Sequence, residues 1–518
     1  MLELLPVVWC IGGSDSSGGS GIQADTRTLA ALGVHACTVI TAITAQNSSK
    51  VHSIQHTDPK CFRSQLQALE KSHPPRAIKI GMLGNKALVQ ELVEYLKAFR
   101  QEYSSPVICD PVLASTSGAS LLGPEAWTKL KKDLLPLLTV MTPNLPEAEM
   151  LLGHSIRTPD QMEKAAYAFL DWGVPSVIIK GGHALGDSQS RDFWTNGQQR
   201  AWLSHTRIPG PSPRGTGCTF ASALSAAVAW GLDVLDATIV AKAYVHQSYR
   251  EAYHVGQTNT LYLRQKAWPA SSIDLPELSP HFAPEKVQFP DCGPEPLGFY
   301  PIFDRASWLK RLLPLGIRTV QLRIKDLQGY SLEKEIAESI RWARHYACRL
   351  FINDHWEIAL QKGAYGIHLG QEDLESLPRT AWRNLTQSQI RLGLSTHSYA
   401  ELARAHSVHP SYIALGPIFP TTLKAMKFAP QGIPNLKIWR KLVEVPLVAI
   451  GGITLEKANL LLAAGPDGIA VVSDLTQNPN PEARTLDWLK KCSSRAQPSP
   501  EWSAPPCFQP EKEGRLRL

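Results

Sequence analysis

The sequence lacks the patterns that mark membrane proteins, disulfide-rich proteins and metal-cluster proteins. No hydrophobic stretch reaches the roughly 18 uninterrupted apolar residues that a membrane-spanning helix requires. The nine cysteines form no CxxC pair and no Cys/His metal-ligand spacing, and an odd number in a long chain suits free thiols in a reducing compartment. The apolar segment 4–11 has no basic leader and runs into a glycine-rich loop, which predicts a first strand and no signal peptide. We therefore expect a cytoplasmic protein with no membrane partner.

The chain also has little excess charge of one sign. Its formal net charge of +7 divides as 23 basic against 21 acidic residues through Arg264 and 30 against 25 beyond it. Neither part carries the concentrated positive charge of a nucleic-acid-binding domain, so we expect no nucleic-acid partner. The composition, 43% hydrophobic and 19% charged, is close to the globular average and predicts well-packed domains.

Length and a shift in composition divide the chain into two domains. A single core usually stops growing near roughly 250–300 residues, so a chain of 518 residues predicts two of them. Residues 266–296 are rich in proline and lose apolar periodicity, which indicates a linker or irregular connection. We expect one domain over 1–265, a second over 297–477, and a disordered tail rich in proline and serine over 478–518.

Both domains are predicted to be α/β. In the first, β-rich runs such as Ala77–Ile80, Val107–Cys109 and Ser176–Ile179 alternate with helical patterns, which predicts a layered α/β/α sheet with parallel strands. In the second, eight short strands recur at fairly even intervals and predict a closed TIM (β/α)8 barrel. These eight strands are expected at Phe299–Phe303, Val320–Ile324, Leu350–Asn353, Gly366–Leu369, Arg391–Leu394, Tyr412–Leu415, Leu447–Ile450 and Ile469–Val472.

The first domain contains two glycine-rich segments suited to bind an anion. The loop over 12–21 permits positive φ angles and a close approach to a ligand. The second, Arg214–Thr219, precedes the apolar helical run Phe220–Trp230. Backbone N–H groups of a helix N-terminus, including those of Gly215 and Gly217, would therefore face an anion with the helix dipole in support. We predict the transferred phosphate at this position.

Charged residues follow three apolar runs of the same domain. Asp110, Glu147 and Lys180 would each stand near a strand end, with Asn144 close to Glu147. Carboxylates hold Mg²⁺, often through water, and a lysine neutralises phosphate oxygens. Taken singly, each residue is more often a solvated charge or a helix cap. Their joint placement instead favours a phosphotransferase site that holds Mg²⁺ and phosphate oxygens.

Ordered motifs make this domain resemble the hydroxymethylpyrimidine and phosphomethylpyrimidine kinase family of the ribokinase-like fold, over about residues 7–262. The motifs are IGGSDSSGGSGIQAD, TAITAQN, KIGML, DPV, TPNLPEAE, IKGGH and GTGCT. The resemblance implies two successive ATP-dependent transfers, first onto the hydroxymethyl group and then onto the monophosphate. It also implies a pyrimidine pocket lined by Asp25, Gln46, Met82 and Val112.

The resemblance gives Cys218 a candidate catalytic role. Cys218 stands where many sugar kinases of this fold carry an aspartate base, and a helix N-terminus would favour its thiolate. The alternative is a buried structural cysteine. With Gly215, Gly217 and Lys180 it completes the predicted catalytic set.

Polar residues of the second domain fall at the ends of its expected strands, which form the catalytic rim of such barrels. Asp354 and Asp373 are suited to hold Mg²⁺, and Arg323, Lys325 and Lys424 can neutralise a leaving diphosphate. The glycines at 451–452 and the backbone at 472–473 are typical of a phosphate cup after strands seven and eight.

Nearly continuous motifs make residues 297–475 resemble thiamine phosphate synthase: YPIFDR, VQLRIKD, FINDHW, GIHLGQED, LGLSTHS, YIALGPIFPTTLK, VAIGGIT and GIAVVS. The resemblance implies that a pyrimidine diphosphate ionises, or nearly so, to a methylene cation that a thiazole nitrogen captures, giving thiamine phosphate and diphosphate. It assigns the pyrimidine diphosphate to Gln321, Leu322, Arg323, Ile324, Lys325, Asn353, Ser395 and Lys424. It assigns the thiazole phosphate to Thr421, Thr422, Leu423, Gly452, Val472 and Ser473.

Three positions depart from the family patterns. Arg214 stands where histidine is common, Thr116 where lysine is common, and Leu423 where threonine is usual. Our leading hypothesis is that both domains are active and that the kinase product feeds the synthase. The family resemblances imply a homo-oligomer. One alternative is a vitamin B6-type kinase whose barrel binds its ligand without turnover, although Gln46 and Met82 favour a pyrimidine. The other is a ligand-sensing or scaffold protein.

Overall fold

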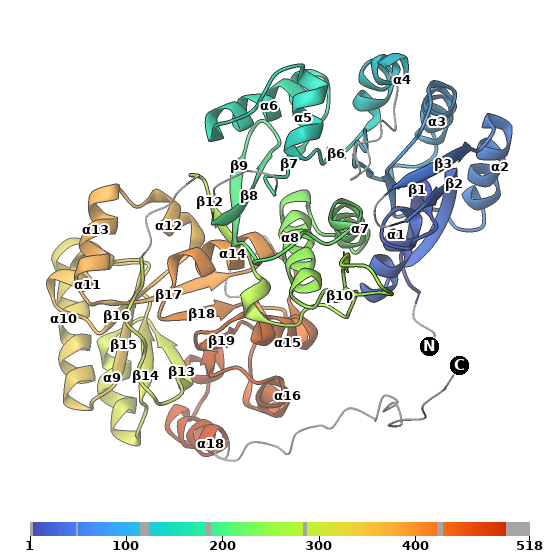
Figure 1. Ribbon diagram of the computed structural model, residues 1–518. Coiled ribbons are helices and arrows are strands. Elements are labelled where there is room, and N and C mark those ends of the chain that lie inside the picture. The colour runs from blue at the N-terminus through green and yellow to red at the C-terminus, as the bar shows by residue number, and fades with distance from the viewer. Residues whose placement is uncertain are drawn as a thin grey trace, which may run out of the picture.

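The computed structural model describes residues 4–493, apart from 48–49, 114–123, 183–187, 283–286 and 422–427. Four residues named above, Thr116, Thr422, Leu423 and Lys424, lie outside the described residues. The chain forms a layered sheet domain followed by a closed barrel, with the two domains in contact (Figure 1). This arrangement confirms the predicted fold class.

The first domain is built on a single ten-stranded sheet. Its strands lie in the order β12 (Glu277–Ser279), β9 (Arg200–Thr206), β8 (Gln189–Thr195), β7 (Val177–Ile179), β6 (Val140–Met141), β5 (Val107–Cys109), β4 (Ala77–Ile80), β1 (Val7–Asp15), β2 (His35–Gln46) and β3 (Val51–His56). The central strands from β7 to β2 are parallel, and antiparallel strands extend both edges. The parallel strands are short and apolar because helices cover both of their faces. A separate two-stranded sheet consists of β10 (Tyr253–His254) and β11 (Leu261–Tyr262).

Helices cover the sheet on both faces, as alternating side chains require. Val8 and Cys10 of β1 enter one buried cluster with α1, α7 and α8, whereas Trp9 and Ile11 enter another with α2, α3, α5 and α6. The helices of this domain are α1 (Gly21–Ala31), α2 (Pro59–Glu70), α3 (Lys86–Phe99), α4 (Pro124–Lys129), α5 (Leu145–Leu152), α6 (Pro159–Asp171), α7 (Thr216–Ala229) and α8 (Val234–Arg250).

The second domain is a closed barrel of eight parallel strands, and each predicted strand lies within two residues of an observed one. The strands are β13 (Gly298–Phe303), β14 (Thr319–Leu322), β15 (Arg349–Asn353), β16 (Gly366–Leu369), β17 (Arg391–Thr396), β18 (Tyr412–Leu415), β19 (Leu447–Ile450) and β20 (Gly468–Val471). The helices are α9 (Ala306–Leu312), α10 (Gly329–His345), α11 (Trp356–Gln361), α12 (Gln371–Ser376), α13 (Arg379–Gln387), α14 (Tyr399–Val408), α15 (Gly432–Leu442), α16 (Ala458–Ala464), α17 (Ser473–Thr476) and α18 (Pro481–Ser493).

The proline-rich connection packs against both domains. Its strand β12 pairs with β9 and extends the first sheet, which the composition did not indicate. Further along, Cys292 is buried at the N-terminal end of the barrel. There the guanidinium of Arg349 donates hydrogen bonds to the carbonyl oxygens of Cys292, Glu295 and Pro296, at 3.2, 2.9 and 2.6 Å. Prolines remove backbone donors, but the remaining carbonyls still find partners in the barrel.

The predicted disordered tail needs correction over its first part. Residues 481–493 form helix α18, which returns to the barrel. Trp488 is fully buried, stacks on Phe299 with ring centroids 5.6 Å apart, and donates a hydrogen bond from Nε1 to Asp474 at 2.7 Å. One large aromatic side chain therefore anchors a segment whose polar composition predicted disorder. Residues 494–518 lie outside the described part of the chain.

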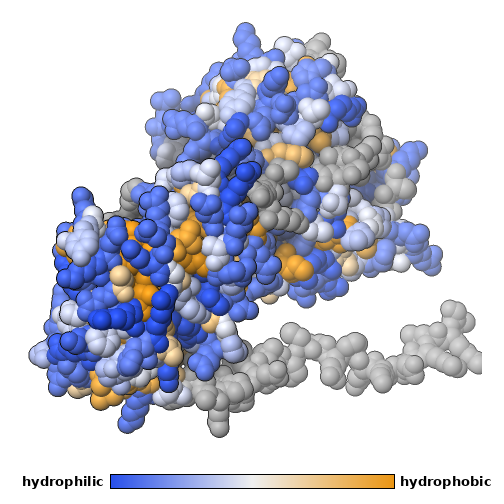
Figure 2. Space-filling model, turned by 90° about the vertical axis from the view of Figure 1, so that its left-hand side faces the viewer, coloured by the Kyte–Doolittle hydropathy of each residue, from blue (hydrophilic) through white to orange (hydrophobic). Residues whose placement is uncertain are grey.

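The two domains share a buried interface. Helix α14 of the barrel packs against α8 and β12 (Figure 1), and buried apolar residues continue from the α7–α8 layer into the outer layer of the barrel. Seen from the barrel side, the surface is largely hydrophilic with smaller hydrophobic areas (Figure 2). Among the described residues, no helix combines the length and apolar character needed to cross a bilayer.

Candidate active sites

The first domain has a cavity of about 470 Å³ where the parallel strands of its sheet end. Ligands of open α/β sheets bind at the carboxyl ends of the strands. The structure brings every predicted residue of this domain to the cavity wall, although these residues come from distant parts of the chain. They are Asp25, Gln46, Met82, Asp110, Val112, Asn144, Glu147, Lys180, Gly215, Gly217 and Cys218.

The N-terminus of α7 forms an anion cradle in this cavity. Its N-cap, Gly215, has φ +82° and offers no side chain that could cap the helix, and a Cβ there would collide with the carbonyl oxygen of Gly19. A Cβ on Gly217 would lie 3.1 Å from Asp110 Oδ2 and 3.4 Å from Lys180 Nζ. Both glycines therefore keep space open between the helix N–H groups and a charged pair.

The charged pair is Asp110 and Lys180, with Lys180 Nζ 2.7 Å from Asp110 Oδ1. Burial disfavours the ammonium of Lys180, but Asp110 and Glu147 outweigh this effect and raise the pKa of Lys180. Burial also raises the pKa of Glu147 to about 7, against the lowering effect of Lys180. Asn144 forms the N-cap of α5 in a reciprocal capping box with Glu147, at 2.8 and 2.9 Å. The backbone N–H of Asn144 thus holds the Glu147 carboxylate in place.

The floor of the cavity holds a second buried ion pair that the sequence did not indicate. Both carboxylate oxygens of Asp25 accept hydrogen bonds from Lys79 Nζ, at 2.9 and 2.8 Å, and Oδ1 also accepts one from the Ser222 hydroxyl at 2.8 Å. Lys79 lies 54 residues from Asp25 along the chain. Asp25 therefore lines the predicted pyrimidine pocket as a partnered carboxylate, with its charge already balanced.

The apolar part of the pocket contains Met82 and Val112, which pack around Ala42. Gln46 stands beside them at the end of β2, where its backbone carbonyl oxygen accepts a hydrogen bond from the Ser16 hydroxyl at 2.7 Å. An apolar surface next to an amide suits a flat heterocycle with polar edges.

Asp15 organises the glycine-rich loop and was missed by sequence reasoning. Its Oδ1 accepts a hydrogen bond from the Ser17 N–H at 2.8 Å and its Oδ2 accepts one from the Ser20 N–H at 2.8 Å. Arg214 Nη2 lies 3.8 Å from Asp15 Oδ2, and Arg214 Nη1 donates to the carbonyl oxygen of Asn47 at 2.7 Å. Arg214 thus ties the loop to the N-terminus of α7. The position of Asp15, directly before the serines and glycines of the loop, was the sequence feature that could have indicated this role.

The prediction of a favoured thiolate at Cys218 is wrong. Burial raises the pKa of Cys218 to about 11, and the ammonium of Lys79 only partly offsets this effect. The side chain is half-buried at the cavity wall, where loss of hydration and the neighbouring carboxylate of Asp25 favour the neutral thiol. At neutral pH Cys218 is a neutral thiol.

A second cavity of about 300 Å³ adjoins the cradle and shares Asn144, Lys180 and Gly217 with the first. Its far wall comes from α8 and from the antiparallel strands, elements that carried no sequence motif. Lys242 Nζ pairs with Asp192 Oδ2 at 2.8 Å on this wall. Two cavities meeting at one anion cradle have the layout needed for two ligands that exchange a phosphoryl group.

The rim of the barrel carries the predicted carboxylates. Asp354 follows β15 with φ +62°, and Lys325 forms an ion pair with it. Burial raises the pKa of Asp373, and the neighbouring charge of Asp354 raises it further. The N–H of Gly370 donates to Asp373 Oδ2 at 3.1 Å. The two carboxylates are therefore neighbours on the rim, as predicted.

The predicted substrate contacts at residues 321–325 fall on two opposite faces of β14 and of the residues that follow it. Leu322 and Ile324 belong to the buried apolar layer outside the strands, so their predicted substrate contacts cannot come from their side chains. Gln321 is buried on the other face, Arg323 is half-buried, and Lys325 is exposed. The reason is the alternation of side chains along a strand, which points every second residue away from the lumen.

Asn353, at the end of β15, has an unsatisfied polar group. Its Nδ2 is buried and has no hydrogen-bond partner among the described residues. A buried amide donor without a partner is costly unless a ligand accepts from it. This observation supports the predicted contact of Asn353 with a substrate.

A buried hydrogen-bond chain inside the barrel was not predicted. His368 Nε2 lies 2.8 Å from Ser395 Oγ, and its Nδ1 lies 2.7 Å from the Tyr412 hydroxyl, which in turn lies 2.8 Å from the Tyr300 hydroxyl. Burial lowers the pKa of His368 to about 4, so the imidazole is neutral. These hydrogen bonds hold Ser395 at its predicted place. The sequence feature that could have predicted them is the histidine of GIHLGQED, at a lumen-facing position of its strand.

The predicted phosphate cup lies where β19 and β20 end. Gly452 has φ +64°, and a Cβ there would collide with the carbonyl oxygen of Pro420. Val472 follows β20, and Ser473 begins α17. Thr421 is half-buried at the last described position before residues 422–427. The cup therefore depends on backbone shape at Gly452 more than on any one side chain.

Neither site contains a complete set of protein ligands for a metal. Within the described residues, no group of three or more His, Cys, Asp and Glu side chains could hold a metal ion. Each site does contain two neighbouring carboxylates, Asp110 with Glu147 and Asp354 with Asp373. Hard oxygen donors of this kind suit a divalent cation whose remaining ligands are phosphate oxygens or water.

Comparisons with known proteins agree with the two-site layout. A family model described as phosphomethylpyrimidine kinase matches residues 15–262, and one described as thiamine monophosphate synthase matches residues 300–475. The chloroplastic thiamine biosynthetic bifunctional enzyme of Arabidopsis thaliana is 32% identical over 490 residues, which covers 91% of this chain and 90% of that protein.

Relatives of single domains are also similar. The thiamine-phosphate synthase of Rhizobium etli is 51% identical over 192 residues, covering 37% of this chain and 93% of that protein. A crystal structure of phosphomethylpyrimidine kinase from Clostridium difficile is 36% identical, covers 47% of this chain and 99% of that chain, and has a TM-score of 0.42.

Proposed function

This chain belongs to the family of bifunctional thiamine biosynthetic enzymes, and we propose that its two sites act in sequence. The first site would use ATP to phosphorylate 4-amino-5-hydroxymethyl-2-methylpyrimidine to its monophosphate and then its diphosphate. The barrel would join this diphosphate to thiazole phosphate, forming thiamine phosphate and releasing diphosphate. The vitamin B6-type alternative is not supported, because both family matches and the full-length relative carry thiamine pathway names.

One observation carries the kinase proposal: the anion cradle of α7 opens between the pyrimidine pocket and the second cavity. The pyrimidine would lie against Met82 and Gln46, and the nucleotide would occupy the second cavity. The transferring phosphoryl group would then face the N–H groups at Gly217 and the ammonium of Lys180, which stabilise its charge. As a neutral thiol, Cys218 would orient the hydroxymethyl oxygen by a hydrogen bond, and the hydroxyl proton would pass to an oxygen of the transferred phosphoryl group as the new P–O bond forms.

Mg²⁺ fits the carboxylate pairs of both sites. Asp110 and Glu147 would hold it in the kinase, and Asp354 and Asp373 in the synthase. When bound, the ion would neutralise phosphate oxygens and favour departure of the leaving group. Lys180 pairs with Asp110 and Lys325 with Asp354, so each lysine would stand beside a phosphate bound at its carboxylate pair.

In the barrel, the unpartnered Nδ2 of Asn353 would donate to the pyrimidine diphosphate. Arg323 and Lys325 would hold the departing diphosphate, and Ser395 would contact the substrate from its place beside the neutral His368. The lumen below is filled by Tyr300 and by other buried side chains, which exclude water from a methylene cation.

The decisive experiment is mass spectrometry of products after full-length protein is incubated with the hydroxymethylpyrimidine, thiazole phosphate, ATP and Mg²⁺. Thiamine phosphate supports all three steps. Accumulated pyrimidine monophosphate would contradict the second phosphorylation and point to Thr116 or Arg214. Accumulated pyrimidine diphosphate would contradict the coupling step and point to the loop at Leu423.

We also propose that the protein works in the cytosol. The cysteines of the described residues are all free thiols, which agrees with a reducing compartment. Fractionation of cells that express the native protein tests this location.

A further inference from the structure

The kinase domain supplies a helix cap to the barrel. Asp236 lies in the first turn of α8, is 6% exposed, and faces the N-terminus of α14. The backbone N–H of Ala400 donates a hydrogen bond to Asp236 Oδ1 at 2.7 Å. Ala400 is the second residue of α14, where an N–H group has no partner within its own helix.

Helix α14 completes its N-terminus with groups from both domains. Ser398, its own N-cap, accepts a hydrogen bond only from the Glu401 N–H, at 3.3 Å. The N–H of Ala400 is satisfied by Asp236, 164 residues away. A carboxylate beside a helix N-terminus is also favoured by the helix dipole. The kinase domain thus provides both a hydrogen bond and a charge that the barrel lacks at this point.

Two connections join this cap to the predicted synthase site. Along the chain, α14 begins four residues after Ser395, the residue held by His368. Through space, Arg404 of α14 donates to Gln371 Oε1 at 3.1 Å, and Gln371 Nε2 donates to the carbonyl oxygen of Ser395 at 2.7 Å. A displacement of α14 would therefore shift Ser395 both through the chain and through the hydrogen bonds of Gln371.

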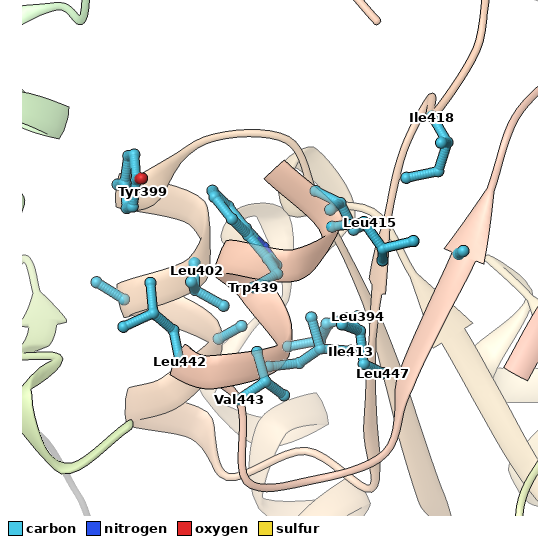
Figure 3. Close-up of a cluster of buried hydrophobic side chains, with 14 of the residues drawn as sticks. Leu394, Tyr399, Leu402, Ile413, Leu415, Ile418, Trp439, Leu442, Val443 and Leu447 are labelled. Atoms are coloured by element: carbon cyan, nitrogen blue, oxygen red, sulfur yellow. The ribbon is translucent and has the colours of Figure 1, made fainter. Parts of the chain in front are cut away.

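The opposite face of α14 is held by the barrel core. Tyr399 and Leu402 pack with Trp439 and Leu442 of α15, beside side chains of β17, β18 and β19 (Figure 3). The ring centroids of Tyr399 and Trp439 are 4.9 Å apart. Apolar packing resists removal of the helix but leaves small shifts along its axis open, and the directional hydrogen bond from Asp236 limits those shifts.

We propose that Asp236, a residue of the kinase domain, is a positioning residue for the synthase reaction, because it fixes α14 and through it Ser395. The proposal rests on the proposed function of the barrel. Burial and the nearby Asp233 raise the pKa of Asp236 to about 6, while its hydrogen bond with Ala400 lowers it, so the group is mainly ionised at neutral pH. The barrel alone would therefore be an impaired synthase even when it is folded.

The test compares Asp236→Ala with the wild type in the full-length chain, using pyrimidine diphosphate and thiazole phosphate supplied directly. Loss of a charged hydrogen bond should raise the KM for pyrimidine diphosphate and lower the synthase kcat/KM about tenfold. The kinase kcat/KM, measured in the same preparation, should stay within about twofold. Partial unfolding would lower kcat and leave KM unchanged, so a KM change identifies positioning.

Two further variants keep the test decisive. Asp236→Asn retains an oxygen acceptor for Ala400 and should restore most of the synthase KM. Ser407→Ala is the matched control, because Ser407 also joins α14 to the kinase domain, through Leu278 at 2.7 Å, but from the far end of the helix. It should leave the synthase KM unchanged.

Three results would overturn the proposal: an unchanged KM in Asp236→Ala, no recovery in Asp236→Asn, or an equal KM change in Ser407→Ala. If Asp236→Ala does not fold, Asp236→Glu takes its place, because its carboxylate stands one methylene further out and cannot accept from Ala400 without moving α14, and a synthase KM equal to that of Asp236→Asn would contradict the proposal. Failure of the wild type to make thiamine phosphate is a separate outcome, which contradicts the proposed function itself.

Discussion

The two sites of this protein handle charge differently. In the kinase cavity the side chains of Asp110 and Lys180 are only 4% and 13% exposed, whereas at the barrel rim Asp354 and Lys325 are 22% and 56% exposed. A buried pair loses much hydration and depends on its partner, while an exposed pair is screened by water. The comparison indicates a preformed electrostatic site in the kinase and a more solvated charged pair at the rim of the synthase.

The largest effect is expected when the buried pair is broken. Lys180→Met would leave Asp110 and Glu147 buried without their cation and would remove positive charge from the anion cradle. We expect the kcat/KM for pyrimidine phosphorylation to fall about 10³-fold. A coupled assay of ATP consumption measures this rate, and the synthase activity of the same preparation is the control. A loss smaller than tenfold would show that the pair is not preformed for catalysis.

A smaller effect is expected at the solvated rim. Asp373→Asn should lower thiamine phosphate formation about 100-fold, because one of two neighbouring carboxylates loses its charge. Pyrimidine phosphorylation by the same protein should be unaffected. Glu372→Gln, an exposed neighbour on the same helix, is the matched control. Equal loss of both activities would contradict separate sites.

The third prediction concerns the backbone at Gly452, in the phosphate cup of the barrel. Gly452→Ala would force a Cβ against the Pro420 carbonyl oxygen and disfavour the φ of +64°, so we expect the KM for thiazole phosphate to rise about tenfold. Steady-state kinetics of the synthase measures this change. Gly316→Ala separates the two causes, because Gly316 has φ +107° with open space around its Cβ position. A KM change in both variants would assign the effect to barrel stability.

The smallest effect concerns pH. The pKa of Glu147 rises from 4.5 to about 7 on folding, so the folded kinase domain keeps a proton that the unfolded chain releases in this window. The free energy of unfolding should therefore decrease as the pH rises from 4.5 to 7, with a slope that corresponds to the release of about one proton on unfolding. Above pH 7 the free energy should level off. Glu147→Gln should flatten this slope. Urea unfolding of both proteins between pH 5 and 8 measures it, and parallel slopes would contradict the assignment.

Much of the fold could be predicted because its signals are local. The barrel strands are short apolar runs separated by polar turns, and each lies within two residues of its predicted place. Residues that follow such runs reach a common edge in any parallel sheet, so Asp110, Glu147 and Lys180 were placed together before their contacts were known. The left-handed φ of Gly215 and the crowding at Gly217 also agree with their predicted role in an anion cradle.

Other features depend on residues that are distant in sequence. Lys79 of β4 neutralises Asp25 of α1, and His368 of β16 holds Ser395 of the neighbouring strand β17. The pKa of Cys218 depends on burial by the whole domain, so a local motif predicted the wrong charge state. Trp488 is one aromatic residue in a polar segment, and only its stacking on Phe299 reveals an ordered helix.

The sequence by itself determined the two domains, the eight strands of the barrel and the edge at which polar residues collect, because apolar periodicity and glycine positions act over a few residues. Only the tertiary structure decided which charges are paired, which thiol stays protonated, and that a kinase residue caps a barrel helix. Those outcomes depend on burial and on distances between chain segments, since desolvation and hydrogen bonding take effect only after packing brings the groups together.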